Sequence, residues 1–273
     1  MKIAITGGKG GTGKSMVATS LANYLAENHS VLLVDADVEC PDDHLLIGIE
    51  RKVVKAVWQF IPKFDLEICR KCGRCSQVCK EKAIFWMKGR YPIFFPELCI
   101  GCSACRLACP FGAIKEGRRK MGRIYSGKAK FDFLGGELEI GQEEAGPVVN
   151  ELKNTAERLG TYDFILIDTA AGTHCNVISA LLGCDLALAV AEPTPFGSHD
   201  LRLILELCRV LDIPVKIVLN KAGIGSEDEI EKIAGEFKTE IITKIPFSKS
   251  ILKAYSQGRP VRHPSIRRIL KYL

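Results

Sequence analysis

The sequence Gly7-Gly8-Lys9-Gly10-Gly11-Thr12-Gly13-Lys14-Ser15 has the form of a phosphate-binding loop. It follows residues 2–6, an apolar run with the β-branched composition of a buried strand, and it precedes residues 16–25, which have helical spacing. Glycines in such a loop bring backbone N–H groups close to phosphates, and the helix dipole adds positive charge. Lys14 would reach the β- and γ-phosphates, and the Ser15 hydroxyl would bind Mg²⁺. The sequence therefore predicts a nucleotide site at this turn.

The bulk composition fits one large α/β domain or two smaller units, because the chain has 273 residues and 47% of them are hydrophobic. No apolar run approaches the roughly 20 residues that span a bilayer. Met1 leads directly into the first predicted strand without a secretory signal. We therefore expect a cytoplasmic protein.

The cysteines gather in one part of the chain, since eight of the 12 lie within residues 69–109. Disulfides are not expected in a long chain with a nucleotide loop and no export signal, so the pattern indicates metal or cluster ligation. The same spacing occurs twice, 30 residues apart, as an internal repeat. The two runs are Cys69-x-x-Cys72-x-x-Cys75-x-x-x-Cys79 and Cys99-x-x-Cys102-x-x-Cys105-x-x-x-Cys109-Pro110. Zinc is the alternative, but zinc sites usually separate their cysteine pairs by longer spacers.

This repeat resembles the bacterial two-cluster ferredoxins, and the resemblance implies two [4Fe–4S] clusters. In that pattern three thiolates of each run bind one cluster, backbone N–H groups face the sulfurs, and the fourth cysteine begins a short helix that leads to the other cluster. The implied ligand sets are Cys69, Cys72, Cys75 and Cys109 for one cluster and Cys99, Cys102, Cys105 and Cys79 for the other. One departure is Lys80, which follows Cys79 where the pattern often has proline; it removes no ligand.

The formal charge of +6 does not by itself indicate a nucleic-acid partner. Two oxidised clusters with four thiolates each would contribute roughly −2 apiece and bring the loaded protein close to neutral. Basic residues surround the first cysteine run, either to steer an acidic electron carrier or as an ordinary solvated face. These residues are Arg70, Lys71, Arg74, Lys80 and Lys82.

The second lysine of the loop, Lys9, gives it the form K-G-G-T-G-K-S. This form resembles the deviant Walker A motif of the MinD/ParA/Mrp ATPases and the nitrogenase iron protein. The resemblance implies an ATP- and Mg²⁺-dependent dimer in which Lys9 crosses the interface to the partner's nucleotide; a solvated loop lysine is the alternative. The loop residues expected to bind the nucleotide are Gly8, Lys9, Gly10, Gly11, Thr12, Gly13, Lys14, Ser15 and Met16.

Two further predicted buried strands end in aspartates: residues 30–35 end in Asp35, and the apolar run that follows Tyr162 and Asp163 ends in Asp168. Carboxylates at the ends of parallel strands lie where an open α/β sheet binds its ligand. By resemblance to the family, Asp35 would orient the attacking water and Asp37 would help hold Mg²⁺, although both could be loop caps. Asp168 has the Walker B position and would meet Mg²⁺ through water, and the N–H of Gly172 would sense the γ-phosphate. The expected catalytic residues are Lys9, Lys14 and Asp35.

The base-binding residues are expected later in the chain. Asn220, at the end of the predicted strand 215–221, resembles the family's adenine-facing asparagine, although a strand-end asparagine is often only a turn residue. Pro246 and Phe247 resemble the segment that lines the adenine pocket. A further strand, residues 185–191, and helices at residues 143–159 and 200–211 complete the pattern.

The predicted fold is a doubly wound, mostly parallel α/β sheet of residues 1–61 and 119–273, interrupted by a small α+β ferredoxin-like domain of residues 62–118. Residues 119–141 read as returning β-structure, and Leu159 is expected on the same side of its helix as Val148, Val149, Leu152 and Ala156. The basic segment 265–273 is expected to pack on its own domain, so a membrane partner is not expected. Cys184 and Cys208 have apolar neighbours and are expected in the core.

The leading functional hypothesis is an ATPase that couples dimer switching to electron transfer through the two clusters. The dimer would be homomeric or formed with a related chain, and the electrons would pass to or from a redox partner protein. The alternatives are an ATP-dependent carrier of the Mrp type, which delivers clusters to an apo acceptor, and a ParA-like positioning protein. Cys40 and Cys175 follow the two switch segments, and a metal bridging two subunits at Cys175 is a subsidiary hypothesis.

Overall fold

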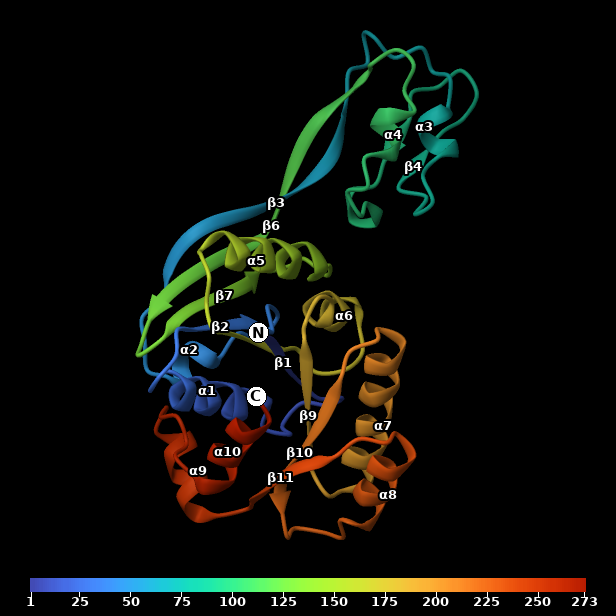
Figure 1. Cartoon of the computed structure of the whole chain (residues 1–273). Coiled ribbons are helices and arrows are strands. Elements are labelled where there is room, and N and C mark those ends of the chain that lie inside the picture. Colours follow the sequence, from blue (N-terminus) through green and yellow to red (C-terminus); the bar gives the residue numbers. More distant parts are fainter. The chain divides into compact units, whose positions relative to one another are not determined.

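The computed structural model describes residues 1–273, which divide into two compact units (Figure 1). The larger unit comprises residues 1–55 and 122–273, and the smaller unit, called the insert below, comprises residues 56–121. The insert is longer at both ends than the predicted 62–118. The chain passes between the units within two long strands, β3 (Lys52–Phe64) and β6 (Ile114–Lys128), so no break in the strands marks the boundary.

The larger unit alternates strands and helices along the chain. Its strands are β1 (Lys2–Thr6), β2 (Val31–Ala36), β7 (Asp132–Leu138), β8 (Phe164–Thr169), β9 (Leu186–Ala191), β10 (Val215–Ala222) and β11 (Ile241–Pro246). Its helices are α1 (Lys14–Leu25), α2 (Asp43–Leu46), α5 (Gly146–Arg158), α6 (Cys175–Leu181), α7 (Pro195–Val210), α8 (Asp228–Glu236), α9 (Lys249–Ser256), α10 (Pro264–Arg268) and the 3₁₀ turn η2 (Ile269–Tyr272).

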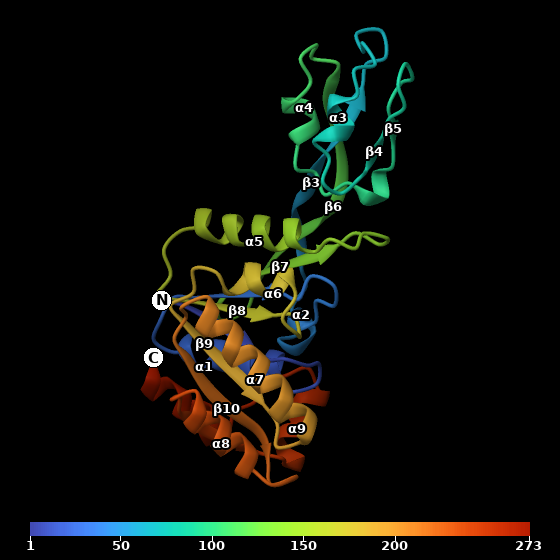
Figure 2. The ribbon, with the colours of Figure 1, turned by 90° about the vertical axis from the view of Figure 1, so that its right-hand side faces the viewer.

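These strands belong to a nine-stranded sheet in the order β11-β10-β9-β1-β8-β2-β7-β6-β3. The pairings from β11 to β7 are parallel, and β7 pairs with β6 in antiparallel register. Figures 1 and 2 show α1, α9 and α10 on one face and α5, α6, α7 and α8 on the other. The predicted mostly parallel, doubly wound sheet is confirmed.

The core of the larger unit lies where α1 packs on the sheet. Ile3, Leu21 and Leu166 are fully buried there, and so are Ile266 and Ile269 near the C-terminus. The terminal segment therefore packs on its own domain, as predicted. No helix is both long and apolar enough to cross a membrane.

Two helix predictions were partly wrong. Leu159 is 50% exposed because α5 ends at Arg158, so Leu159 is only its C-terminal flanking residue. Helix α7 begins at Pro195, not at residue 200. Its start follows from capping chemistry, since the Thr194 hydroxyl accepts a hydrogen bond from the Gly197 N–H at 3.0 Å and proline suits the first helical position.

The insert contains short elements only. They are α3 (Arg74–Gln77), β4 (Ile84–Phe85), β5 (Ile93–Phe94), the 3₁₀ turn η1 (Pro96–Leu98) and α4 (Ala104–Leu107). Its backbone repeats the 30-residue period of the cysteines, because three pairs of residues with positive φ occur at that offset. The pairs are Lys71 and Gly101, Gly73 and Ser103, and Lys82 and Gly112.

Candidate functional site

The glycine-rich loop connects β1 to α1, as predicted, and Lys14 is the first residue of the helix. Gly13 has a φ of 94°, and a Cβ atom there would lie 2.3 Å from the Asn220 amide nitrogen. Only glycine therefore fits this position. The Lys14 amine donates to the Lys9 carbonyl at 3.3 Å, which places it inside the loop.

A pocket of about 370 Å³ lies beside this loop. Residues from distant parts of the chain line it, including most of the predicted nucleotide contacts. The predicted residues on its wall are Gly10, Gly11, Gly13, Lys14, Ser15, Met16, Asp37, Asn220, Pro246 and Phe247. The Asn220 amide donates to the Thr12 carbonyl at 2.7 Å, so one of its functions is to hold the loop. Asp42 and Tyr255 also line the pocket and were missed by sequence reasoning.

Asp35 and Asp168 are directly paired across β2 and β8, and each is only 1% exposed. Burial raises the pKa of Asp168 to about 7, opposed by a hydrogen bond from the Ser15 hydroxyl. Burial and the neighbouring Asp168 charge raise the pKa of Asp35 well above its ordinary value. One carboxyl oxygen of Asp168 has no hydrogen-bond partner. Acidic side chains are therefore concentrated at this edge of the sheet, and the Lys14 charge and the Ser15 hydroxyl offset the burial of Asp168 only in part.

Asp43, which sequence reasoning missed, adds a third buried carboxylate. Its side chain is fully buried and neither carboxyl oxygen has a partner, while its N–H donates to Asp35 at 3.2 Å. Burial, followed by the charges of Asp168 and Asp35, raises its pKa well above the ordinary value. Burial also raises the pKa of Asp37. Carboxylate oxygens are the ligands that a hard divalent cation such as Mg²⁺ prefers, but these side chains do not form a group of three that could hold the ion by themselves.

The segment after β8 lies against the phosphate loop. The Gly172 N–H donates to the Gly7 carbonyl at 3.2 Å, and Gly172 has a φ of 93°. The Thr169 hydroxyl donates to the Thr6 hydroxyl at 3.1 Å. The N–H that was predicted to sense the γ-phosphate is therefore hydrogen-bonded to the phosphate loop itself.

Lys9 does not project freely into solvent. Its amine forms an ion pair with Glu192 at the end of β9, and Lys221 pairs with the same carboxylate at 2.8 Å. Burial alone would raise the pKa of Glu192, but hydrogen bonds from Lys221 and Lys9 lower it below its usual value. Sequence reasoning missed Glu192 and Lys221, although both lie at strand ends, where ligand sites of such sheets occur.

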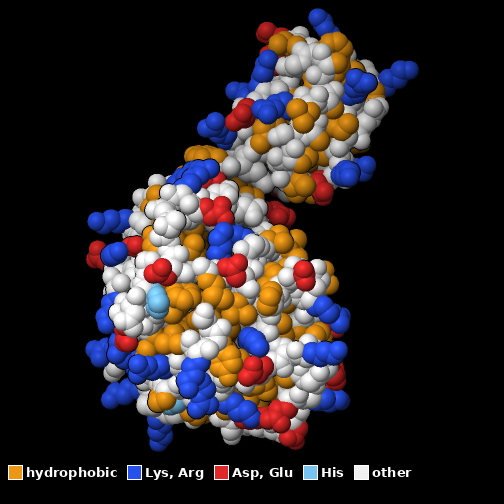
Figure 3. Space-filling model, viewed as in Figure 1, with side chains coloured by type: hydrophobic (Ala, Val, Ile, Leu, Met, Phe, Trp, Pro, Cys, Tyr) orange, Lys and Arg blue, Asp and Glu red, His pale blue; other side chains and the backbone are white.

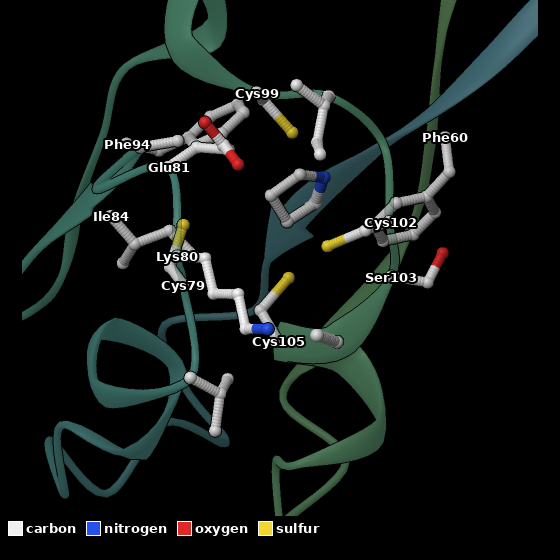
Figure 4. Close-up of a pocket in the computed structure, with 15 residues that line it drawn as sticks. Phe60, Cys79, Lys80, Glu81, Ile84, Phe94, Cys99, Cys102, Ser103 and Cys105 are labelled. Atoms are coloured by element: carbon white, nitrogen blue, oxygen red, sulfur yellow. The ribbon is translucent and has the colours of Figure 1, made fainter. Parts of the chain in front are cut away.

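In the insert, Cys79, Cys99, Cys102 and Cys105 line one pocket of about 290 Å³. Figure 4 shows their sulfur atoms directed toward a common space. The remaining four, Cys69, Cys72, Cys75 and Cys109, line a second, narrower pocket of about 20 Å³. Each pocket is thus lined by three cysteines of one run and the fourth cysteine of the other run.

The position of the short helices differs from the prediction. The third cysteine of each run lies inside a helix, Cys75 in α3 and Cys105 in α4, and the fourth cysteine follows the helix end instead of beginning it. The cause is the positive φ of Gly73 and Ser103, which turns the chain just before each helix. Burial raises the pKa of the Cys105 thiol to about 11, opposed by a hydrogen bond from the Arg106 N–H.

No group of three or more His, Cys, Asp or Glu side chains is close enough together to hold a single metal ion. A cubane has four irons with one thiolate on each, so its ligands are spread more widely than around one ion. Cys184 and Cys208 are buried, as predicted, whereas Cys40 and Cys175 are exposed. Cys40 also lines the nucleotide pocket.

Comparisons with known proteins agree with this geometry. Residues 3–261 match the family model of the CobQ/CobB/MinD/ParA nucleotide binding domain. An uncharacterized protein of Methanocaldococcus jannaschii is 37% identical over 94% of this chain and 90% of its own length. The septum site-determining protein MinD of Pyrococcus horikoshii, solved with Mg-ADP, is 22% identical, with a TM-score of 0.56 over 95% of this chain and 86% of that one.

The cell division ATPase MinD of Pyrococcus furiosus has a TM-score of 0.59 at 20% identity and covers 100% of this chain and 99% of its own. At such identities these two structures show a shared fold. The family match carries the assignment, because it spans the loop, both aspartate-bearing strand ends and the strand β10 that contains Asn220. This chain belongs to the CobQ/CobB/MinD/ParA nucleotide-binding domain family.

Proposed function

We propose that this protein is an ATPase that couples nucleotide-dependent dimerization to electron transfer through two [4Fe–4S] clusters. The observation that carries the proposal is the gathering of four cysteines at each of two pockets, in a chain whose other unit has a nucleotide site. A nucleotide switch and a redox unit in one polypeptide are most simply explained if one controls the other.

Binding of ATP and Mg²⁺ is supported by the match to the nucleotide-binding domain family and by polar atoms beside the loop that have no hydrogen-bond partner. The Thr12 hydroxyl and one Asp168 oxygen are buried without a hydrogen-bond partner. Leaving such groups unpaired is costly, so a ligand that pairs with them is expected. Ser15, Asp37 and Asp168 would hold the cation. When bound, Mg²⁺ would neutralise phosphate charge during hydrolysis.

The protein's own residues would act by positioning and charge. Lys14 would contact the phosphates from inside the loop. Asp35 accepts hydrogen bonds from the N–H groups of Asp37 and Asp43, both at 3.2 Å, so its carboxylate is held in place to orient a water molecule. Lys9 would leave Glu192 and reach the nucleotide of a partner subunit.

The insert has features that a cluster-binding unit needs. Its buried core cluster consists of Ile84, Cys105 and Ile114, which is small for independent folding. Units of this size usually require disulfides or metals, and the cysteines here are unbridged. The two sets, Cys69, Cys72, Cys75 with Cys109 and Cys99, Cys102, Cys105 with Cys79, would each hold one cluster. When bound, such clusters carry single electrons at potentials tuned by nearby charge and hydrogen bonds.

A second candidate function is ATP-dependent delivery of clusters to an apo acceptor. One thiol of each set, Cys72 and Cys102, is exposed, so an acceptor could approach either site. Stable electron transfer and delivery differ in one measurable property, which is the lability of the bound iron.

The test is reconstitution under anaerobic conditions, followed by iron and sulfide analysis and incubation with an apo-ferredoxin. The proposed function predicts about eight irons and eight sulfides per chain, ATPase activity, and no transfer to the apo-ferredoxin. Transfer that accelerates with MgATP would favour delivery. Protein that binds no iron and sulfide would overturn both candidates.

A further inference from the structure

Positive charge is concentrated in the insert. Residues 56–121 contain 13 lysines and arginines but only five aspartates and glutamates, whereas the rest of the chain contains 25 and 27. Figure 3 shows lysine and arginine side chains distributed over the insert surface, with few acidic ones among them. The excess of eight positive charges is twice the roughly −4 that two oxidised clusters would contribute, so loading does not neutralise the insert.

Three of these cations surround one cysteine pocket. Arg70, Lys71 and Arg74 line the pocket of the Cys69 set together with Cys72. Arg70 and Arg74 are exposed, and Lys71 is half-buried with its amine 4.4 Å from the centre of the Tyr91 ring. None of the three forms an ion pair with an acidic side chain. Their charge is therefore available to a partner.

The surroundings of the other pocket are different. The Cys79 set is lined by one cation and one anion, Lys80 and Glu81. Farther along the insert, Arg106 and Arg118 both pair with Glu116, at 3.2 and 3.1 Å. Uncompensated charge thus lies at one pocket and not at the other.

Apolar side chains accompany the three cations. Tyr91 is 41% exposed and Phe111, on the pocket wall, is 46% exposed. Cys72 itself is also exposed, so little protein covers the sulfurs on this side. Aromatic and arginine side chains are enriched in protein–protein interfaces, whereas acidic side chains are depleted there. Complexes between electron-transfer proteins use small interfaces.

We propose that this surface, formed by Arg70, Lys71, Arg74, Tyr91 and Phe111 and called the basic patch, docks an acidic electron-carrier protein with its own iron–sulfur cluster. The inference rests on the proposed electron-transfer function and names its entry point. One electron would leave the reduced carrier and enter the group held by the Cys69 set; no bond or proton is exchanged. A nucleic acid is a less suitable partner for the basic patch. Tight binding to a phosphate backbone requires many cationic contacts, and the patch has three cations.

The test uses reconstituted full-length protein and a purified acidic bacterial ferredoxin, reduced beforehand, with stopped-flow mixing at several salt concentrations. Electrostatic steering predicts a rate constant that falls about tenfold between low salt and roughly 0.3 M salt. The triple variant R70Q/K71Q/R74Q should lose about tenfold of the low-salt rate and most of the salt dependence.

The matched control is K63Q/K88Q/K115Q, which removes the same charge from exposed lysines of the insert that line neither pocket. Its rate should change less than about twofold. Equal losses in both triples, a rate independent of salt, or tight binding of a DNA duplex in place of the ferredoxin would overturn the docking inference. Reduction by dithionite distinguishes failure of the docking inference from failure of the proposed function. If dithionite does not reduce the reconstituted protein, the proposed electron-transfer function is itself wrong.

Discussion

The side chain of Lys9 is paired with Glu192 of its own chain, on the neighbouring strand end. Glu192 is only 5% exposed, and the second lysine on it, Lys221, also donates to the Gly11 carbonyl at 2.8 Å. The lysine expected to cross to a partner subunit is thus held in a charged network around its own phosphate loop. In the proposed dimer, crossing would require this contact to break, so Glu192 would oppose dimer formation.

Replacing this carboxylate should therefore favour the dimer. The variant Glu192→Gln keeps the shape of the side chain but removes the charge that retains Lys9. Sedimentation with a non-hydrolysable ATP analogue should show dimers at three- to tenfold lower protein concentration, which corresponds to roughly 1 kcal/mol. Glu240→Gln, which removes an exposed partner of Lys216, is the control and should have no effect. Weaker dimerization of Glu192→Gln would show that the contact supports the active form.

The buried carboxylates predict an unusual pH dependence of stability. Folding raises the pKa of Asp168 from 3.8 to about 7, and it raises those of Asp35 and Asp43 as well. Between pH 3.8 and about 7 the folded state therefore binds more protons than the unfolded state. The free energy of unfolding of the ligand-free protein should therefore fall as pH rises through about 7. Thermal unfolding at a series of pH values would measure this.

The variant Asp43→Asn isolates one of these charges. It should stabilise the ligand-free protein near pH 8 by about 1 kcal/mol or more, and the gain should shrink as pH falls, because burial raises the pKa of the Asp43 carboxyl and protonation removes the charge. MgADP should reduce the difference, since the cation compensates the charge in the unsubstituted protein. A variant that is less stable at both pH values would mean that Asp43 has a structural role that charge does not explain.

The two units should be separable by function. Lys14→Ala removes the amine inside the phosphate loop and is expected to abolish ATP hydrolysis, as shown by phosphate release. Its iron content should equal that of the unsubstituted protein, because the insert has its own core and its own cysteines. Loss of iron in this variant would indicate that the insert depends on the nucleotide site for folding.

The crossed ligand sets can be tested with double variants. Cys79→Ala with Cys99→Ala removes two ligands from one set, so about four of about eight irons should remain. Cys79→Ala with Cys69→Ala removes one ligand from each set and should leave almost none. Cys40→Ser, outside the repeat, serves as the control. The opposite order of iron contents would show that each run of four cysteines binds its own cluster.

Much of the fold was predictable because its signals are local. The loop from Gly7 to Ser15 and the apolar strands that end in Asp35 and Asp168 identify the parallel sheet, since each combines a buried strand with a polar strand end. The limits of the insert were not predictable, because β3 and β6 continue through the boundary without a break in strand character.

The site was predictable where a motif specifies it and not where tertiary contacts do. Asn220 and Phe247 were found through the resemblance to the family, and both line the pocket. Asp43 was missed because nothing in its neighbours along the chain distinguishes a buried carboxylate from an exposed one, and the strand end before Glu192 does not by itself indicate an ion pair with Lys9. Their burial is produced by packing between segments far apart in the sequence.

Electron paramagnetic resonance of the dithionite-reduced protein, with and without MgATP, is the most direct test of the coupling between nucleotide and redox unit. The proposed coupling predicts signals of two reduced [4Fe–4S] clusters that change on addition of MgATP in the unsubstituted protein, and that do not change in Lys14→Ala. Identical spectra with and without MgATP, in protein shown to bind the nucleotide, would contradict it.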